Sequence, residues 1–547
     1  RWLVALYGGA TLPIEAAGLT AGNRTEGHRV LGSAKGITVR DSESYLKGLE
    51  RQGVTPDPQR RRRMIEEQIA ALCKKTGFRL NVDGDLLDQA VYTTECPNAI
   101  IGSFKPAYLE VPQEILITSM KEHQGFFSLM HKETGKLVPH FIAVTNNRAK
   151  DMGLIREGNE RVLAARLADA KFFFDEDRKV KLEERVTKLA GVTFHQKLGT
   201  MEKKQERVRK LAGFIASSLR PQDDELKQAC ERAADLCKAD LLTGVVGEFP
   251  ELQGIMGGEY AKHDGESEKV WKAIRDQYLP RGMDERLPET VEGKVLSLAD
   301  RLDTIVAFFR AGIIPRGSED PYSLRRHALS IVRIIIEGKL KLNLDELVEK
   351  SDGIVGEHIN NSSSMLNDPL RFIFERFRFY TGALHVQRDD VMSAVCETAD
   401  KRTPLDLVDL LDQMKALQAV TVKPEFDPLI VGFKRAHRLV EKEKNEWVRQ
   451  PVNPALFQHP HEFKLREAWE KNNQLVGQLL VERKYPKALE SLVRMKPAID
   501  DFFTAVMVNA DDPSVRSNRL SLLKDIDELF LLFADFSQIV VQGEGRE

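Results

Sequence analysis

The sequence predicts a multidomain, mainly α-helical protein whose first part is an α+β module. Three observations support this class. The chain has 547 residues, 42% of them hydrophobic, and is therefore long enough to bury several separate cores. Strand-like alternation of apolar and polar residues is concentrated in about the first 156 residues. From there to the end, apolar residues recur at helical spacing between breaks at prolines.

The first 156 residues combine strand patterns with one clear helix. Two stretches near the start predict strands, WLVALYGG (2–9) and LPIEAAGL (12–19), and we expect the first to be buried. A helix is predicted over QRRRRMIEEQIAALCKKTG, ending at Gly77. The stretch GFFSLMHKETGKLVPHFIAVTNN (125–147) predicts two strands joined by a turn at Thr134 and Gly135.

Among the helices that follow, the one predicted within PRGSEDPYSLRRHALSIVRII (315–335) carries two adjacent arginines. We expect Asp320 to cap it and Pro321 to occupy its first position. Its apolar face would be buried, and the residues of that face are Leu324, Ala328, Ile331 and Ile335. From this segment alone we favour a capped core helix whose adjacent arginines, Arg325 and Arg326, form a solvated pair.

Overall charge and cysteine usage restrict the function classes. The formal net charge is −2 although 30% of residues are charged, so a polyanion site must come from local clustering of cations. The five cysteines form no CxxC pair, which fits a reducing compartment, and Cys230 with Cys237 fit small core residues. We find no membrane-spanning run and no signal peptide, and expect a cytoplasmic or organelle-matrix protein that does not contact membranes. Because the first residue is Arg1, we also expect an N-terminal portion to be missing.

The motifs of nucleotide and hydrolytic chemistry are absent from the sequence. There is no GxxxxGK[ST] loop, GxGxxG, HExxH or GxSxG, and no zinc spacing of Cys and His. His195, Asp240 and Asp300, each on or beside a helix, could together hold a metal that activates water. The adjacent His-Asp pair that such a site requires is missing, because Ala239 precedes Asp240, so buried helix contacts are the alternative.

Two helices near the C-terminus carry clustered cations. VGFKRAHRLVEK (431–442) contains Lys434, Arg435 and Arg438, and VRSNRL contains Arg516 and Arg519 at the start of a helix that Asp511 or Asp512 with Pro513 would cap. These cations either contact phosphates or form a solvated helix face. Core positions are expected for the nearby aromatic side chains of Phe502, Phe503, Phe530 and Phe533.

Several stretches together resemble the beta subunit of the bacterial-type heterotetrameric glycyl-tRNA synthetase. They occur in the order of that family and cover nearly the whole chain. They include GLTAGNRTEGHRVLG, LLDQAVYTTECPNAIIGSFKPAYLEVPQEILITSMKEHQGFFSL, FHQKLGTMEKKQERV, KADLLTGVVGEFPELQGIMGGEYA, ADRLDTIVAFFRAGIIPRGSEDPYSLRRHAL, FKRAHRL and FFTAVMVNADDPSVRSNRLSLL. The family's subunit also has a portion ahead of WLVALYG that this chain lacks.

The resemblance implies four parts. Residues 1–156 would be the α+β module shared with the beta subunit of the phenylalanyl enzyme, and residues 157–345 an HD-type helical domain. Residues 346–400 would connect it to residues 401–547, a helical anticodon-binding domain like that of arginyl-tRNA synthetase. His195, Asp240 and Asp300 would be degenerate HD positions that hold no metal, and Asp320, Arg325 and Arg326 would lie at a structural junction. There the two arginines either brace the HD-type and C-terminal helices through carboxylates or contact RNA; we favour bracing.

The resemblance also implies a division of labour between two subunits. ATP, Mg²⁺ and glycine are expected at the alpha subunit, in an α2β2 complex or in a fused alpha half, and this chain would hold no cofactor and no catalytic residue. It would bind tRNA(Gly) through Lys434, Arg435, Arg438, Arg516 and Arg519. The alternatives are an HD-type metal-dependent phosphohydrolase acting on nucleotides or RNA ends, and a scaffold that only holds the alpha subunits.

Overall fold

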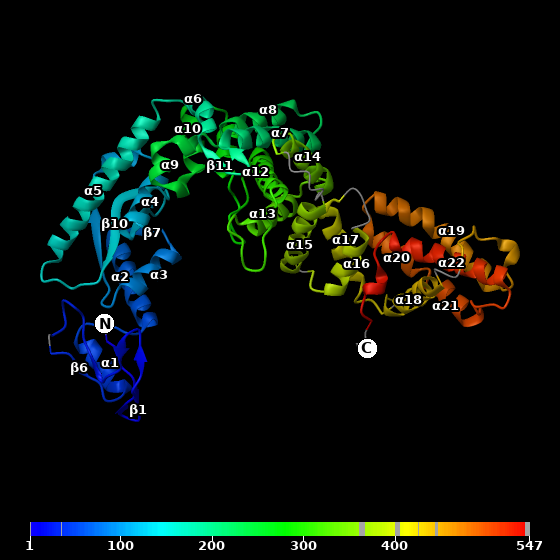
Figure 1. Ribbon diagram of the computed structural model, residues 1–547, viewed down its shortest axis with the longest axis horizontal. Helices are drawn as coiled ribbons and strands as arrows, with labels where there is room; N and C mark the ends of the chain where they lie inside the picture. The colour runs from blue at the N-terminus through cyan, green and yellow to red at the C-terminus, as the bar shows by residue number, and fades with distance from the viewer. Residues whose placement is uncertain are drawn as a thin grey trace. The chain divides into compact units, whose positions relative to one another are not determined.

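The computed structural model in Figure 1 describes residues 2–33, 35–359, 367–384, 386–399, 405–424, 426–443 and 447–541. The chain divides into two compact units. Unit 1 comprises Arg1–Val186 and Ala239–Glu266, and unit 2 comprises Thr187–Lys238 and Ser267–Glu547. The boundary predicted after residue 156 lies inside a helix, α5 (Met152–Asp177), which belongs wholly to unit 1.

Unit 1 holds the four-stranded sheet of the protein's α+β part, together with short helices. Its regular strands and helices, besides α5, are β1 (Leu6–Tyr7), β2 (Ala10–Thr11), β3 (Glu15–Ala16), β4 (Leu19–Thr20), β5 (Arg24–Thr25), β6 (Ile37–Thr38), α1 (Ser42–Arg51), α2 (Pro58–Thr76), β7 (Phe78–Leu80), α3 (Gly84–Thr93), β8 (Asn98–Ser103), α4 (Gln113–Thr118), β9 (Phe126–His131), β10 (Leu137–Thr145), α6 (Leu182–Val186), α9 (Gly244–Glu248) and α10 (Ile255–His263).

The sheet has the antiparallel order β7-β9-β10-β8. Successive residues point to opposite faces, so Phe127 and Ile142 join the core beneath α2 and α3, whereas Phe126 and Phe141 stack on each other at 4.7 Å between ring centres. Phe141 lies opposite Gly102 in the register, and a Cβ at residue 102 would come within 2.4 Å of the Phe141 ring. Glycine at this position therefore lets the ring lie flat on the neighbouring strand.

The strongest local signals of unit 1 are confirmed. α2 begins at Pro58, where the Asp57 carboxylate accepts the Gln59 N–H, and ends at Gly77, whose φ of 77° lies in the left-handed region. β9 and β10 form the predicted pair on either side of the turn at Thr134 and Gly135.

The prediction of a buried first strand is wrong. β1 to β6 are each two residues long and pair as three small hairpin-like ladders, and Tyr7 is 80% exposed. Two-residue strands cannot cover an apolar face, so this region has only a small core of Ile37, Val39 and Leu49.

Unit 2 is almost wholly helical, as predicted. Apart from the short pair β11 (Thr193–His195) and β12 (Gly199–Thr200), its regular elements are α7 (Met201–Leu219), α8 (Asp224–Leu236), α11 (Glu268–Asp276), α12 (Val291–Arg310), α13 (Leu324–Glu337), α14 (Leu344–Gly356), α15 (Asn367–Ala383), α16 (Asp389–Ala399), α17 (Leu407–Val420), α18 (Phe426–Glu443), α19 (Pro460–Val481), α20 (Tyr485–Val493), α21 (Lys496–Ala505) and α22 (Pro513–Leu531).

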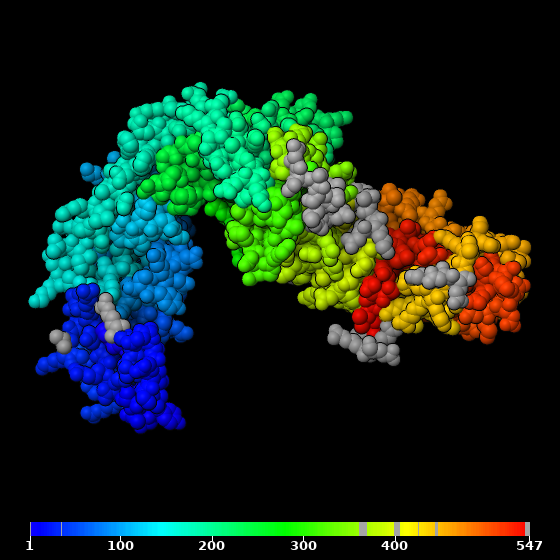
Figure 2. Space-filling view, viewed as in Figure 1, coloured from blue at the N-terminus to red at the C-terminus, as the bar shows by residue number. Residues whose placement is uncertain are grey.

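Two packing centres organise unit 2. α12 is buried on almost every side because α7, α8, α11, α13 and α14 pack around it. Toward the C-terminus, α18 packs on α21 and α22, and α19 packs on α20, α21 and α22. Figure 2 shows these C-terminal helices as one continuous body. Cys230 and Cys237 are fully buried small residues of this unit, as predicted.

The start of α13 differs from the prediction. The Asp320 carboxylate does accept N–H groups of the first turn, from Leu324 at 2.8 Å and from Arg325 at 2.9 Å. However, the helix begins at Leu324, and Pro321 lies in the preceding turn, because Ser323 adopts a left-handed backbone with φ 54°. The predicted apolar face is buried. Among the described helices, none is long and apolar enough to cross a membrane.

Candidate nucleic-acid interface

A concentration of positive charge lies along one face of α18. The opposite face, including Phe433 and Ala436, is buried against the neighbouring helices, which fixes the rotation of α18. The helical period then places a group of cations together, one or two turns apart. This group, here called the basic strip, consists of Lys434, Arg435, Arg438 and Lys442.

The basic strip forms one wall of a groove of about 830 Å³, here called the α18 groove. The other wall is the end of α21 and the irregular segment after it, with Phe503, Met507 and Asn509. α18 approaches α21 closely at Gly432, where a Cβ would stand 3.1 Å from Ile499. The groove lining holds four cations and no carboxylate. Such a lining attracts a polyanion, and it contains no carboxylate that would repel one.

One cation of the strip is paired with an aromatic ring. The guanidinium carbon of Arg435 lies 4.5 Å from the centre of the Phe503 ring. Arg435 and Arg438 are exposed, whereas Lys434 is 9% exposed. Met507 is 77% exposed and adds an apolar surface to the opposite wall. Planar cations, an aromatic ring and apolar contact are the groups on which nucleic-acid bases stack.

Arg519 does not reach the groove as a direct ligand. It is 6% exposed, and its Nε donates to the Glu462 Oε1 at 2.9 Å. Its Nη1 donates to the Met507 carbonyl at 2.8 Å. The expectation that Arg519 touches RNA is therefore corrected: the side chain supports the wall of the α18 groove from behind. Arg516 pairs with Glu443 on α18, and Asp512 caps α22 as predicted.

Sequence reasoning missed three groups of this groove. Phe503 was assigned to the core together with Phe502, Phe530 and Phe533, but it is only half-buried and lines the groove. Lys442 and Met507 were not singled out. Lys442 could have been found, because it follows Arg438 by four residues and so continues the strip. Met507 carries no such signal, since its exposure depends on how the segment after α21 is held.

The three residues predicted to be degenerate HD positions, His195, Asp240 and Asp300, have separate surroundings. The Asp240 carboxylate accepts the Gly254 N–H at 2.6 Å and the Gly257 N–H at 3.1 Å, and these two hydrogen bonds hold the start of α10 in place. His195 packs against the rings of Phe308 and Tyr322. In the described part of the chain, no group of three or more His, Cys, Asp or Glu side chains could hold a metal ion. The phosphohydrolase alternative finds no support in this arrangement.

Asp300 belongs instead to a buried network of charges in unit 2. Its Oδ1 lies 3.0 Å from Lys204 Nζ and 3.2 Å from Lys238 Nζ. Burial acts to raise the pKa of the Asp300 carboxyl, but the two ammonium groups outweigh it and hold that pKa well below its usual range. Lys204 also contacts Asp303 at 3.1 Å, and Asp303 pairs with Arg207 at 2.6 Å. The network joins α7 to α12 through charged groups that are nearly inaccessible to water.

The same network makes the stability of unit 2 sensitive to acid through His327. Burial, together with the guanidinium of Arg301 at 3.1 Å, lowers the pKa of His327 from 6.5 to about 3. Below pH 6.5 the His327 side chain is therefore protonated in the unfolded chain, whereas in the folded chain it stays neutral down to about pH 3. As the pH falls below the pKa of the free histidine side chain, we expect His327 to lower the free energy of unfolding by about 1.4 kcal/mol per pH unit.

Urea unfolding of the wild-type chain and of His327→Asn between neutral pH and about pH 4 measures this contribution. Asparagine can still accept the hydrogen bond from Arg301 but does not titrate. The difference in unfolding free energy between the two proteins should change across that range. Parallel curves would show that His327 does not bind its proton differently in the two states.

Arg325 and Arg326, the two arginines of the junction, have different surroundings. Arg325 donates to the carbonyls of Gly317 at 2.8 Å and Glu319 at 3.5 Å, so it braces the turn ahead of α13. It does so through backbone carbonyls and not through carboxylates as predicted, and the Asp320 carboxylate accepts the first N–H groups of α13. Arg326 is exposed on the first turn of α13.

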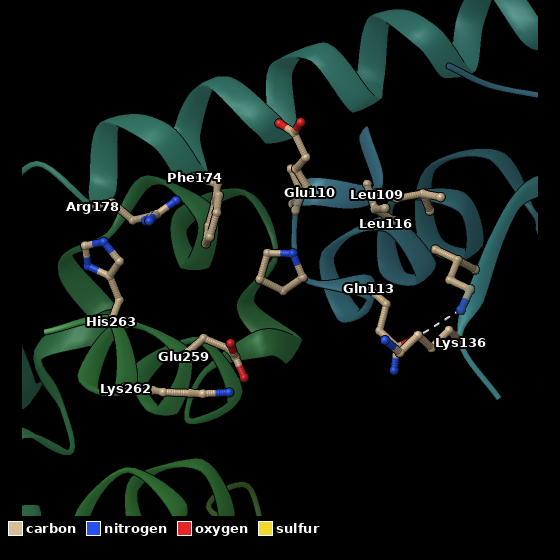
Figure 3. Close-up of a pocket in the computed structure, with 13 residues that line it drawn as sticks. Leu109, Glu110, Gln113, Leu116, Lys136, Phe174, Arg178, Glu259, Lys262 and His263 are labelled. Carbon is tan, nitrogen blue, oxygen red and sulfur yellow. Dashed lines mark hydrogen bonds between the residues drawn. The ribbon is translucent and has the colours of Figure 1, made fainter. Parts of the chain in front are cut away.

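Unit 1 contains a second sizeable pocket, of about 720 Å³, which Figure 3 shows in close-up. Arg178 and His263 lie on one side, and Gln113 with Lys136 lies on the other. Arg178 follows the last residue of α5, so its positive charge complements the carbonyl end of that helix, and His263 is the last residue of α10. The carboxylates of Glu110 and Glu259 line the same pocket. This balance of charge suits a polyanion less well than the α18 groove does.

Comparisons with known proteins place the α18 groove and the unit 1 pocket in segments that match two different family models. The family model described as "Glycyl-tRNA synthetase beta subunit" matches residues 1–397, and the one described as "DALR anticodon binding domain" matches residues 429–531, which contain the α18 groove. The glycine–tRNA ligase beta subunit of Trichlorobacter lovleyi is 41% identical over 98% of this chain and 76% of its own length. That of Geobacter sp. strain M21 is 42% identical over the same shares, and that of Syntrophus aciditrophicus is 38% identical over 99% of this chain and 77% of its own length. The chain therefore belongs to the family of glycyl-tRNA synthetase beta subunits.

Proposed function

We propose that this chain binds tRNA(Gly) through the α18 groove and positions it for glycine attachment in the alpha subunit. The observation that carries the proposal is a groove lined by four cations and no carboxylate, within the segment that matches an anticodon-binding family model. Cations in such a groove displace the counterions condensed on the RNA backbone, which favours binding at low salt.

The groove also offers contacts for unpaired bases. Bases of a single-stranded loop stack on aromatic rings and on guanidinium planes, and base stacking is tolerant of sequence. The Arg435 and Phe503 pair provides both kinds of surface side by side. We therefore assign the groove to a loop of the tRNA and not to a paired stem, in keeping with anticodon contact. Arg516, which pairs with Glu443 on α18, stays a candidate contact.

The chemistry of aminoacylation is assigned to the partner. The sequence has none of the phosphate-binding loops described above, and we propose that glycine, ATP and Mg²⁺ bind in the alpha subunit, in an α2β2 assembly or in a fused alpha half. This chain would raise the effective concentration of the tRNA end at that active site. The HD-type identity of the middle helices and the cytoplasmic location stay predictions.

The proposal is tested by the binding of glycine tRNA to the chain at several salt concentrations. We expect an affinity that falls steeply with salt, and aminoacylation only when the alpha subunit is added. If tRNA binds no better than it does to a neutral protein of similar size at low salt, the proposal is wrong. If the chain binds no tRNA but still binds the alpha subunit, its role is that of a scaffold.

Neutralising the exposed cations of the strip should weaken tRNA binding. For Arg435→Gln and Arg438→Gln we expect a loss of about 1 to 3 kcal/mol each if a base edge is contacted, and less for a lone phosphate. Each lost phosphate contact should also reduce the slope of log K against log salt by about 0.7 to 0.9. Filter binding or fluorescence anisotropy over a salt series measures both quantities.

The matched control for these variants is Arg371→Gln. Arg371 is an exposed arginine on α15, outside the groove, with an ion-pair partner in its own helix. The Arg371→Gln variant loses the same charge and should leave the slope of log K against log salt unchanged. Binding by the double variant Arg435→Gln/Arg438→Gln that equals wild type would show that α18 presents the wrong face for RNA.

A further inference from the structure

A second group of side chains with the character of an RNA contact lies at the turn before α13. Tyr322 lies with its ring centre 4.2 Å from that of Phe308 and 5.5 Å from that of His195. Phe308 is 2% exposed, whereas Tyr322 is 39% exposed. The Tyr322 ring is thus held by Phe308 and His195 and leaves part of its surface to solvent.

The turn that carries Tyr322 is held rigidly. Arg325 donates to two of its carbonyls, and Asp320 accepts two N–H groups of the following helix. Ser323, directly after the tyrosine, is in the left-handed region, which costs energy for a residue with a side chain. A turn braced from both ends keeps the exposed ring in one orientation, so a ligand that stacks on it meets a prepared surface.

Exposed cations are close to this ring along the chain and on the strand pair that carries His195. Arg316 is exposed in the same turn, and Arg326 is exposed four residues after Tyr322. His195, which contacts the Tyr322 ring, belongs to the β11–β12 pair, whose connection carries the exposed Lys197. The exposed carboxylate of the turn is Glu319. Ring and cations together define a surface here called the Tyr322 platform: Arg316, Tyr322, Arg326, His195 and Lys197.

We propose that the Tyr322 platform is a second RNA contact, on which an unpaired base of the bound tRNA stacks against Tyr322 while Arg326 contacts an adjacent phosphate. The inference rests on the proposed function, since the RNA is the tRNA held by the α18 groove. Within unit 2, α15, α16 and α17 lie between α13 and α18, as Figure 1 shows, so one RNA molecule would touch two separate places on the same unit. Two contacts on one ligand strengthen binding beyond either alone, because the second forms within the complex.

Two substitutions at residue 322 and one at residue 326 test the proposal in the full chain with glycine tRNA. Tyr322→Leu keeps an apolar cover on Phe308 but removes the stacking ring, and we expect about tenfold weaker binding. Tyr322→Phe keeps the ring and should bind like wild type. Arg326→Gln should reduce the slope of log K against log salt by about 0.7 to 0.9, whereas Arg371→Gln should not. Thermal unfolding of each variant shows whether the turn stays folded.

A photo-crosslinking amino acid in place of Tyr322 supplies a second measurement that does not depend on affinity. Illumination of the complex should join the chain to an unpaired nucleotide of the tRNA, and sequencing identifies that nucleotide. Crosslinks to the alpha subunit alone, no crosslink to tRNA, or wild-type affinity for Tyr322→Leu would each overturn the proposal. If the wild-type chain itself binds no tRNA, the proposed function has failed; if it binds and only these tests fail, the platform alone is wrong.

Discussion

Replacing Asp303 by asparagine should lower the free energy of unfolding of the chain by about 3 to 5 kcal/mol. Asp303 is 1% exposed and bonds to Arg207 at 2.6 Å and to Lys204 at 3.1 Å. Asparagine has nearly the same shape but no charge, so Arg207 would stay buried without its counter-ion. Removing one partner of a buried ion pair is costly for this reason, even where the intact pair adds little net stability. Urea unfolding followed by circular dichroism measures the loss.

The control for Asp303→Asn is an exposed pair in the same unit. Lys210 and Glu357 pair with both side chains about half exposed, and Glu357→Gln should change the unfolding free energy by less than about 1 kcal/mol. An equally small effect for Asp303→Asn would mean that water or a rearranged Asp300 compensates the two cations, and that the buried network does not hold α7 on α12.

Replacing Arg519 by alanine should both destabilise the C-terminal helices and weaken tRNA binding. Glu462 is fully buried and loses its cationic partner in this variant, which should cost about 3 to 5 kcal/mol of unfolding free energy. The Met507 carbonyl also loses its donor, so the wall of the α18 groove loosens. Thermal unfolding and a tRNA binding isotherm on the same preparation measure the two effects.

Two comparisons separate support of the wall from direct contact. Arg438→Gln should weaken binding without lowering thermal stability, and should reduce the salt slope, whereas Arg519→Ala should leave the slope near that of wild type. Adding Glu462→Gln to Arg519→Ala removes the unpaired charge and should recover part of the stability. A reduced slope with unchanged stability for Arg519→Ala would restore Arg519 as a phosphate ligand.

Local signals in the sequence were sufficient for much of the secondary structure. Asp57, Pro58 and Gly77 mark both ends of α2, because a cap and a left-handed glycine act on their own helix. Asp512 and Pro513 mark the start of α22 in the same way. The paired strands β9 and β10 follow from alternation around one turn. Each of these features depends on residues within a few positions of one another, so no knowledge of the rest of the fold is needed.

The predictions that failed concern features that the rest of the fold decides. The start of α13 lies beyond Pro321 because the preceding turn is braced by Arg325, which points back to Gly317. The strand expected near the N-terminus is two residues long, and its Tyr7 is 80% exposed, because only Leu6 of the two packs against the small core of this region. Phe502 and Phe503 look alike in sequence, but they point to different sides of α21, so one is fully buried and the other lines the groove. Adjacent helix residues point about 100° apart, and only packing decides which direction is inside.

The sequence by itself determined the helical class, the family and the segment that carries the basic strip, because helix periodicity, caps and ordered motifs are written in neighbouring residues. Only the tertiary structure decided which cations are available to a ligand. Arg435 and Arg519 both sit on amphipathic helices near the same groove, yet one is exposed and the other is paired with Glu462. The reason is physical: exposure and pairing are set by the side chains that arrive from α19 and α21, and those are far away along the chain.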